Sequence, residues 1–547
     1  MDRDLSSVQE VRDLLVRAEA ALPALKKLTQ KDVNRITEAM ADAGFQAAER
    51  LAKLAVEETG FGRYEDKVVK NRFATRNLLR YIAGLKTVGF LDEESRDGVY
   101  RIAEPMGVVA AIIPSTNPTS TALYKGIIAL KARNAVVMSP HPAAVRCTIE
   151  ACNVLAAAAE RAGAPKGSVL CMSIPEMSGT QELMRHPITK VILATGGTGL
   201  VRAAYSAGKP AYGVGPGNVP AFIERTADVR KAVQDIIASK TFDYGTVCAS
   251  EQSVIADRPV RDEVVAELKR LHAYFCDEKE TASLEKLMIT PQGGINSAVV
   301  GQPAARIAQM AGFQVAPQTS VLIVPLEGVG KKYPLSMEKL SPVLSFYEAD
   351  GWEKGCERAI EILQFGGLGH TLVIHSRDEA IIREFALKKP VFRVLVNTGG
   401  TQGAIGLSTG LEPALTLGSG TWGGSITADN VTPLHLINIK RLAYEIHPIQ
   451  SQGDAGDTAR STARKSPPAA PSKATAKPAR WGYDEQYRYR PIVEEPKPPE
   501  ARADAPATST PLPGAEARYG STGITEEQIE ALIREFVRGD GAEGEKQ

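Results

Sequence analysis

The sequence lacks the features of a membrane protein, a nucleic-acid-binding protein or a disulfide scaffold. Its 547 residues contain no apolar run as long as a membrane span, and the first residues lack the regions of a signal peptide. The net charge is only +1, with acids and bases interspersed, which argues against an obligatory nucleic-acid partner. The six cysteines show neither disulfide-like nor metal-like spacing. These absences predict a reduced, soluble, intracellular protein without membrane, nucleic-acid or metal binding.

A large apolar fraction and alternating secondary-structure signals are present instead. At 43% hydrophobic residues, a chain of this length can bury two or three cores. Residues 6–85 have apolar positions at helical spacing. From about residue 100, and again over about 246–430, short β-rich runs alternate with helical stretches, as in a parallel sheet covered by helices. The expected strands include 107–113, 135–138, 190–193, 320–324, 371–374 and 393–396, and the expected helices include 121–132 and 143–162.

The composition changes at about residue 447. Residues 447–523 are rich in Pro, Ala, Ser, Lys and Arg, and carry too little apolar surface to offset the entropy of ordering, so we expect a disordered linker. An aromatic cluster at Trp481–Tyr489 is either a docking patch or a group of linker residues without a role. Residues 524–539 have capping-box spacing and one apolar stripe, which predict an amphipathic helix. Such a short helix needs a partner surface, either on its own core or, as the long tether favours, on another protein.

One cysteine differs from the other five. Cys248 lies in a polar turn that begins at Gly245, whereas the others lie among apolar or charged helix-like residues, where cysteine acts as a small hydrophobe. A free thiol is only about 3% thiolate at neutral pH, so a nucleophile needs help from backbone N–H groups or a helix start. The spacing alone leaves a catalytic cysteine and an ordinary core cysteine equally open.

Four further stretches contain groups that could act with this thiol. Asn117 follows an expected strand, where its amide could donate to an oxyanion, although an Asn-Pro turn also explains it. Residues 195–199 lead from a strand into a helix, whose first N–H groups can face a pyrophosphate. Glu338 is either a ligand for ribose hydroxyls or a surface carboxylate. His370, in a glycine-rich loop, is either a general base or a structural histidine.

Taken together and in order, these motifs resemble those of the CoA-acylating aldehyde dehydrogenases. The resemblance covers about residues 5–445, and the branch includes the N-terminal halves of bifunctional aldehyde/alcohol dehydrogenases and the propionaldehyde and acetaldehyde dehydrogenases of bacterial microcompartments. The motifs that carry it are 114–121, 132–142, 194–197, 213–218, the Cys248 segment, 338–342 and 416–424.

The resemblance implies an α/β fold with three parts. These are a Rossmann-like NAD-binding domain over 1–245, an α/β catalytic domain over 246–430 and a β-strand extension used in oligomers, which comes partly from 1–245 and ends in the C-terminal extension of the fold over 431–446. It also implies roles by position. Cys248 is the nucleophile, Asn117 the oxyanion donor and His370 a group that assists deprotonation of CoA. The residues at the dinucleotide are Thr195, Gly196 and Gly197, with Glu338 at the nicotinamide-side ribose.

Two departures from the hydrolytic aldehyde dehydrogenases bear on the reaction. The stretch 213–220 contains no carboxylate, whereas the hydrolytic enzymes carry a water-activating Glu there, so a thioester on Cys248 should persist until a thiol attacks it. Ser139, Pro140 and His141 replace the Lys-Pro-x-Glu type segment that grips the adenosine ribose. NAD is therefore expected with NADP left open, and His141 with a widened groove would help to admit CoA.

The expected activity is CoA-dependent oxidation of a short-chain aldehyde, with propionaldehyde as the first candidate and acetaldehyde as the second. The alternatives are a hydrolytic aldehyde dehydrogenase and a non-catalytic scaffold. The resemblance implies a homo-oligomer, either a dimer or a tetramer. The C-terminal tail resembles the encapsulation peptides of microcompartment enzymes, so we expect shell proteins as partners and the lumen of a bacterial microcompartment, within the cytoplasm, as the location.

Overall fold

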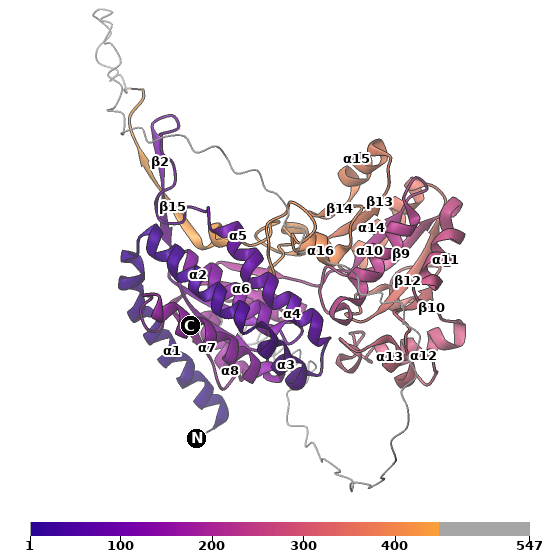
Figure 1. Cartoon of the computed structure of the whole chain (residues 1–547), viewed down its shortest axis with the longest axis horizontal. Helices are drawn as coiled ribbons and strands as arrows, with labels where there is room; N and C mark the ends of the chain where they lie inside the picture. Colours follow the sequence, from indigo (N-terminus) through magenta and orange to yellow (C-terminus); the bar gives the residue numbers. More distant parts are fainter. Residues whose placement is uncertain (1, 448–547) are drawn as a thin grey trace, which may run out of the picture. The chain divides into compact units, whose positions relative to one another are not determined.

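The computed structural model describes residues 2–447 (Figure 1). Nearly all of the expected linker, the aromatic cluster and the expected helix at 524–539 lie outside the described residues. Within the described part, residues 2–95 and 100–442 belong to one compact unit, and residues 96–99 and 443–447 belong to a small second unit. In the second unit, the Tyr444 N–H donates to the Gly98 carbonyl at 2.9 Å.

The N-terminal region is helical, as its apolar spacing predicts. Thr29 and Asp32 form a capping box at the start of the second helix, and Gly60 ends the third in a left-handed conformation, with φ of 68°. The helices are α1 Arg3–Lys27, α2 Gln30–Gln46, α3 Ala48–Thr59, α4 Tyr64–Arg72, the π-helical turn η1 Phe73–Asn77 and α5 Leu78–Ile82.

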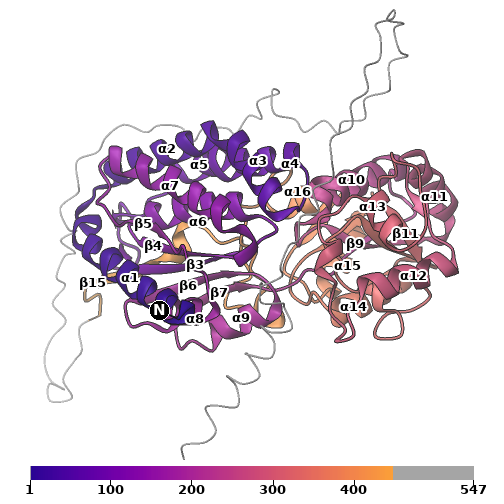
Figure 2. The ribbon, with the colours of Figure 1, turned by 90° about the horizontal axis from the view of Figure 1, so that it is seen from below.

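The first parallel sheet has the strand order β5-β4-β3-β6-β7. Its strands are β3 Val108–Ile113, β4 Ala135–Pro140, β5 Val169–Cys171, β6 Thr189–Thr195 and β7 Ala211–Val214. Every residue of β3 and β4 is buried, which explains their unbroken apolar runs. The helices α6 Pro118–Lys131 and α7 Val145–Arg161 cover one face, and α1, α8 Met177–Arg185 and α9 Thr198–Tyr205 cover the other (Figure 2). The chain adds β4 and β5 on one side of β3, and then β6 and β7 on its other side. Because crossovers between parallel strands are right-handed, the helices that connect the two halves lie on opposite faces of the sheet.

The second parallel sheet has the order β10-β11-β12-β9-β8-β13-β14. Its strands are β8 Val219–Ile223, β9 Glu251–Asp257, β10 Tyr274–Phe275, β11 Leu322–Pro325, β12 Val343–Ala349, β13 Leu372–His375 and β14 Val394–Val396. Its helices are α10 Val229–Thr241, α11 Arg261–Arg270, α12 Glu278–Met288, α13 Ala304–Met310, α14 Trp352–Phe365, α15 Glu379–Lys388 and α16 Gly400–Ala404. Strand β8 pairs with β9 and β13, so this sheet begins ahead of the boundary expected at residue 246.

Shorter elements complete the described part. A third sheet has the order β1-β2-β15, formed by β1 Gly89–Phe90, β2 Val99–Pro105 and β15 Ile437–Ala443. The short 3-10 turns are η2 Pro142–Ala144, η3 Phe242–Gly245, η4 Arg258–Val260, η5 Ser297–Val299, η6 Pro334–Ser336, η7 Thr421–Gly423 and η8 Pro433–Leu436. None of the helices between residues 2 and 447 combines the length and apolar character that crossing a membrane requires.

Buried polar side chains tie the first sheet to its surroundings. Lys125 donates to the carbonyls of Ile112 and Leu193 at 2.7 and 2.9 Å, which holds the carboxyl ends of β3 and β6 together. Asn134 accepts from the Gly107 N–H and donates to the Leu436 carbonyl, both at 2.8 Å. Neither backbone group has water as an alternative partner, so both depend on this one side chain.

We predict that Asn134→Ala lowers the free energy of unfolding by about 3 kcal/mol, because two buried backbone groups lose their partners. Urea denaturation followed by circular dichroism measures the change. The matched control is Asn153→Ala, at an exposed position of α7, which should change stability by less than about 0.5 kcal/mol. If the two substitutions lowered the free energy of unfolding equally, the hydrogen bonds of Asn134 would not be a specific source of stability.

Candidate active site

Cys248 lies between η3 and the second sheet, in the turn that leads into β9. Burial raises the pKa of its thiol to about 12. The carboxylate of Glu338 raises this pKa further, and the guanidinium of Arg393 and the Cys248 backbone N–H lower it. Burial prevails over the backbone assistance expected from the sequence, so the thiol is protonated at neutral pH in this structure.

Gly217 is the point where three candidate residues meet. A Cβ at Gly217 would lie 2.2 Å from the Cys248 carbonyl oxygen and 3.0 Å from Nδ1 of His370. The Gly217 N–H also donates to Oε1 of Glu338 at 2.9 Å. The glycine-rich stretch therefore brings Cys248, His370 and Glu338 together, and no residue with a side chain fits at position 217.

His370 is a buried, neutral imidazole. Nδ1 lies 3.0 Å from Oγ1 of Thr371, and Nε2 has no hydrogen-bond partner among the described residues. Burial, aided by the charge of Arg393, lowers the pKa of His370 to about 3. A ring nitrogen without a partner is free to form a hydrogen bond with a bound substrate.

Arg393 is a functional candidate that the sequence analysis missed. It falls within the strand expected at 393–396 but lies just before β14, where it is buried. Nη1 donates to the His370 carbonyl at 3.0 Å, and Nε donates to Oδ1 of Asn430 at 2.8 Å. Burial lowers the pKa of Arg393 to about 10, so it stays charged at neutral pH. A single sequence contains no signal for this role, because an arginine beside an apolar run is ordinary.

Glu338 is a carboxylate with a high pKa. Burial raises its pKa to about 7, while the Gly217 N–H and the lysines 240 and 339 lower it. It is thus partly ionised near neutral pH. Besides the bond from Gly217, the carboxylate oxygens of Glu338 can accept further hydrogen bonds, for example from the hydroxyl groups of a ribose.

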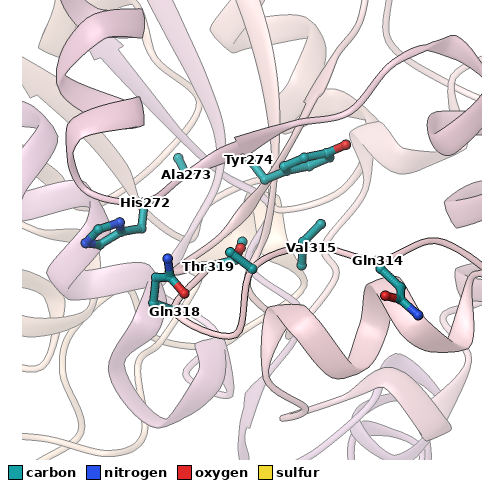
Figure 3. A pocket seen from close by; sticks show the side chains of 8 residues that line it. His272, Ala273, Tyr274, Gln314, Val315, Gln318 and Thr319 are labelled. Carbon is teal, nitrogen blue, oxygen red and sulfur yellow. The ribbon is translucent and has the colours of Figure 1, made fainter.

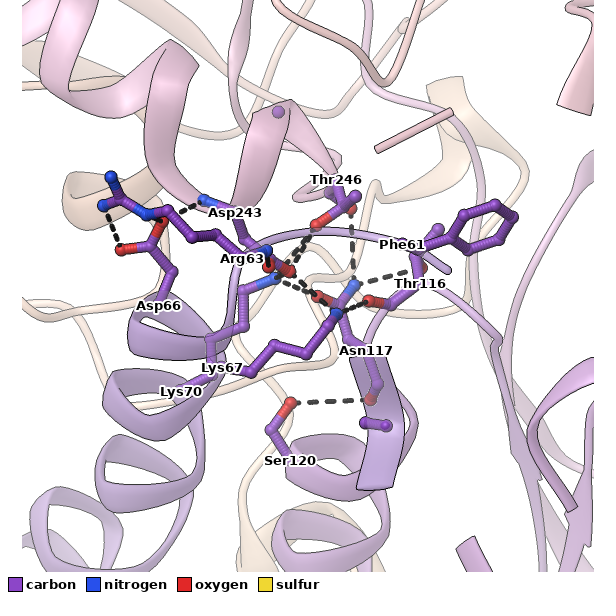
Figure 4. A network of polar contacts seen from close by, with 12 residues as sticks. Phe61, Arg63, Asp66, Lys67, Lys70, Thr116, Asn117, Ser120, Asp243 and Thr246 are labelled. Carbon is purple, nitrogen blue, oxygen red and sulfur yellow. Dashed lines mark hydrogen bonds and ion pairs between the residues drawn. The ribbon is translucent and has the colours of Figure 1, made fainter. Parts of the chain in front are cut away.

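Asn117 lies at the carboxyl end of β3, where it precedes α6 without capping it. Its Nδ2 donates to Oγ1 of Thr116 at 3.1 Å and to the carbonyl of Thr246 at 3.4 Å. Thr246 precedes Cys248 by two residues, so the amide lies beside the cysteine turn (Figure 4). Its Oδ1 accepts a hydrogen bond from the ammonium of Lys70.

The predicted dinucleotide residues flank Asn117, because β3 lies between β4 and β6. Thr195 ends β6, and its buried Oγ1 has no hydrogen-bond partner among residues 2–447. Gly197 is the N-cap of α9 and supplies no side-chain cap, which leaves the first N–H groups of the helix to another acceptor. A Cβ at Gly196 would lie 2.6 Å from Cδ2 of Leu200. This uncapped helix start and the unpartnered hydroxyl fit the pyrophosphate of a dinucleotide.

The β4 segment makes internal contacts. Oγ of Ser139 lies 2.9 Å from Oγ1 of Thr180. Pro140 is the last residue of the strand, and Nδ1 of His141 accepts from the Ala143 N–H at 3.0 Å, which caps η2. The side-chain hydrogen bonds of Ser139 and His141 run within the first sheet and its connections rather than to the cysteine turn.

No predicted site residue lines the hollow drawn in Figure 3, which has a volume of about 490 Å³ and is bordered by residues 272–274, 314–316, 318 and 319. Within residues 2–447, no group of three or more His, Cys, Asp or Glu side chains is arranged to hold a metal ion.

Comparisons with known proteins agree on one family. Residues 3–275 match the model of the aldehyde dehydrogenase family. The bifunctional aldehyde-alcohol dehydrogenase AdhE of Escherichia coli K12 is 42% identical over 444 residues, which are 80% of this chain and 50% of that protein. The chain thus spans about half the length of this curated relative.

Two solved structures extend the comparison. An acetylating aldehyde dehydrogenase from Geobacillus thermoglucosidasius is 51% identical, with a TM-score of 0.81 and coverage of 83% of this chain and 100% of the other. A propionaldehyde dehydrogenase from the fucose utilisation microcompartment of Clostridium phytofermentans is 29% identical, with a TM-score of 0.71 and coverage of 79% and 97%.

We predict that Glu338→Gln speeds alkylation of Cys248 by iodoacetamide at pH 8 by about threefold or more, because loss of the negative charge increases the thiolate fraction. The difference should shrink at pH 5.5, where the native carboxyl is mostly protonated, given its pKa of about 7. Peptide-resolved mass spectrometry measures the rate. Glu285→Gln on α12 is the control; a pH-independent effect would contradict the electrostatic cause.

Proposed function

The chain belongs to the aldehyde dehydrogenase family, in its acetylating branch, and we propose that it converts a short-chain aldehyde to an acyl-CoA. Enzymes of this branch use NAD(H) and CoA. The observation that carries the proposal is that Cys248 and His370 meet at a glycine-rich stretch that has no carboxylate of its own, with the Asn117 amide beside the turn of Cys248.

In the proposed acylation stage, Cys248 releases its thiol proton to the solvent, and the thiolate attacks the aldehyde carbon. The amide of Asn117 and the backbone N–H of Cys248 donate to the resulting oxyanion, which exists only on the reaction path and is the charge that such donors stabilise. Bound NAD supplies the oxidant for this stage by accepting hydride. The residues proposed to hold the dinucleotide are Thr195, Gly196, Gly197 and Glu338, with Ser139, Pro140 and His141 at the adenosine side.

In the proposed transfer stage, the sulfur of CoA attacks the thioester carbonyl on Cys248. The proton of the CoA thiol passes by way of Nε2 of His370 to the departing sulfur of Cys248, so that His370, with its pKa of about 3, carries it only in transit. The bond between Cys248 and the acyl group breaks, and acyl-CoA leaves. Arg393 lies close enough to lower the pKa of Cys248 and so favours the departing thiolate.

A hydrolytic outcome is the second candidate. Glu338 acts electrostatically on Cys248 and has a pKa near 7, so it has the properties of a base that could activate water. Hydrogen bonds from the nicotinamide-side ribose would engage the Glu338 carboxylate and so prevent it from acting as a base toward water. The dependence of turnover on CoA separates the two candidates.

We propose propionaldehyde and acetaldehyde as the candidate substrates. The solved relative described as acetylating, at 51% identity, supports acetaldehyde. The neighbour described as a propionaldehyde dehydrogenase, at 29% identity, supports propionaldehyde, as does the encapsulation-like C-terminal sequence. NADP remains an alternative to NAD, because the segment 139–141 has neither Lys nor Glu.

The proposed setting is the lumen of a bacterial microcompartment, with shell proteins as partners of the helix predicted at 524–539. The microcompartment origin of one structural neighbour supports this setting.

A homo-oligomer, dimer or tetramer, is also proposed, because β15 is an edge strand of the described three-stranded sheet and its outer side can pair with another chain.

The activity is tested by NADH formation at 340 nm with C2 to C4 aldehydes, with and without CoA. We expect CoA-dependent acyl-CoA formation and its loss, by at least about 10³-fold, in Cys248→Ala, because no other group can form the thioester. Cys356→Ala, at a buried cysteine of α14, is the matched control and should remain active. Equally fast release of free carboxylic acid without CoA would establish the hydrolytic candidate instead.

Targeting is tested by deleting residues 520–547. The truncated protein should keep its kcat and KM, because the proposed site lies within 2–447, and should be lost from the purified shell fraction. A charge substitution in the predicted apolar stripe, Leu532→Glu, should have the same effect, whereas Glu535→Gln on its polar side should not. Undiminished shell association of the truncated protein would overturn the targeting role.

A further inference from the structure

A buried ammonium group lies directly behind the Asn117 amide. Lys70, on α4, donates to Oδ1 of Asn117, to the Asp243 carboxylate and to Oγ1 of Thr246, the last at 3.0 Å. Figure 4 shows Lys70 and Lys67 reaching from one helix into this cluster, where Lys67 donates to Asp243 and to the Thr116 carbonyl. All three donor sites of the Lys70 ammonium are therefore occupied.

This contact determines which way the Asn117 amide faces. The oxygen and nitrogen ends of a carboxamide have nearly the same shape, so packing alone distinguishes them poorly. An ammonium group is a donor without an acceptor, so Lys70 can bind only the oxygen end. The Nδ2 end must then face the opposite way, toward the carbonyl of Thr246 and the turn of Cys248.

Asp243 holds the ammonium in place. Its Oδ2 accepts from Lys67 at 3.1 Å and from Oγ1 of Thr246 at 2.7 Å, in addition to Lys70, and its Oδ1 accepts from the Arg63 N–H at 2.7 Å. Asp243 has a left-handed backbone, with φ of 49°. Its carboxylate packs so closely on Gly62 that a Cβ there would lie 1.9 Å from Oδ1.

The cluster also carries an excess of positive charge. The ammonium groups of Lys67 and Lys70 share the single carboxylate of Asp243, while Asp66 pairs with Arg63. Lys67, Lys70 and Asp243 are buried, so solvent screens their charges weakly. A positive charge on the oxygen end of an amide polarises it and makes its N–H groups stronger donors.

We propose that Lys70 is a positioning residue for oxyanion stabilisation: it binds the amide oxygen of Asn117 so that Nδ2 faces the carbonyl bound at Cys248, and Asp243 holds Lys70 in this place. This inference rests on the proposed function, specifically on Asn117 as an oxyanion donor. A purely structural cluster would instead only join α4 to η3, and its loss would reduce stability without a selective effect on the acylation stage.

The test compares Lys70→Met and Asn117→Ala, singly and together, in the full-length protein. We expect Lys70→Met to lower kcat for aldehyde oxidation by about 10- to 100-fold, which is less than the roughly 100- to 1000-fold loss for removing an oxyanion donor outright because the Asn117 amide is still present, with the Kd for NAD unchanged within about twofold. The double variant should be no slower than Asn117→Ala, because Lys70 acts through Asn117. Lys70→Arg, which keeps charge and donors, should recover most of the kcat.

The chain contains a matched control. Lys131, at the end of α6, is also a buried lysine that donates to an asparagine, Oδ1 of Asn34, at 2.6 Å, and its pKa is likewise lowered to about 8 by burial. Lys131→Met should reduce thermal stability and leave kcat unchanged. Lys70→Gln, which removes the charge but keeps a polar side chain, gives the same comparison if Lys70→Met is insoluble.

The outcomes separate the two proposals. If Asn117→Ala retains its kcat, the oxyanion role in the proposed function fails. If Asn117→Ala is slow but Lys70→Met keeps its kcat, or if the two effects multiply in the double variant, only the positioning role of Lys70 is overturned. An equal loss of kcat in Lys131→Met would also overturn it, because a general stability effect would then explain both.

Discussion

The candidate site depends on one buried carboxylate that connects two separate parts of the sequence. Asp243 precedes the cysteine turn, and its carboxylate is bonded to Lys67 and Lys70 of α4 and to the backbone of Arg63. Asn117 is attached to the same cluster through Lys70. Because charged groups in a low-dielectric interior interact strongly and cannot exchange partners with water, this cluster defines where the cysteine turn lies relative to β3.

Burial favours the neutral form of three groups in the candidate site. It disfavours the thiolate of Cys248, the imidazolium of His370 and the carboxylate of Glu338, so all three are displaced toward their neutral forms. Arg393 is buried too but stays charged, and it lowers the pKa of Cys248. The structure thus combines a protonated resting nucleophile with a fixed cation that favours its ionised form.

The glycine-rich stretch at 213–217 has a packing requirement that limits its chemistry. Gly217 lies against the Cys248 carbonyl and the His370 ring, and any side chain there would collide with both. Gly213 is similarly close to Val201 and Tyr205. Position 217 therefore cannot carry a water-activating carboxylate, and none is present elsewhere in the stretch, which agrees with the proposed transfer of the acyl group to CoA.

Local patterns determined the elements of this protein. The helices of the N-terminal region, the apolar runs of β3, β4 and β6, and the α/β alternation could all be predicted, because they arise from periodicity and burial within short segments. The sequence analysis did not identify β8 as the first strand of the second sheet. A short apolar run does not show which strands it pairs with, and here the partners are β9 and β13. Only the tertiary structure decided the convergence at Gly217, the pairing of Lys70 with Asn117 and the burial of Arg393. Contacts between residues far apart in the sequence, and the desolvation that alters their pKa values, exist only once the chain has folded around them.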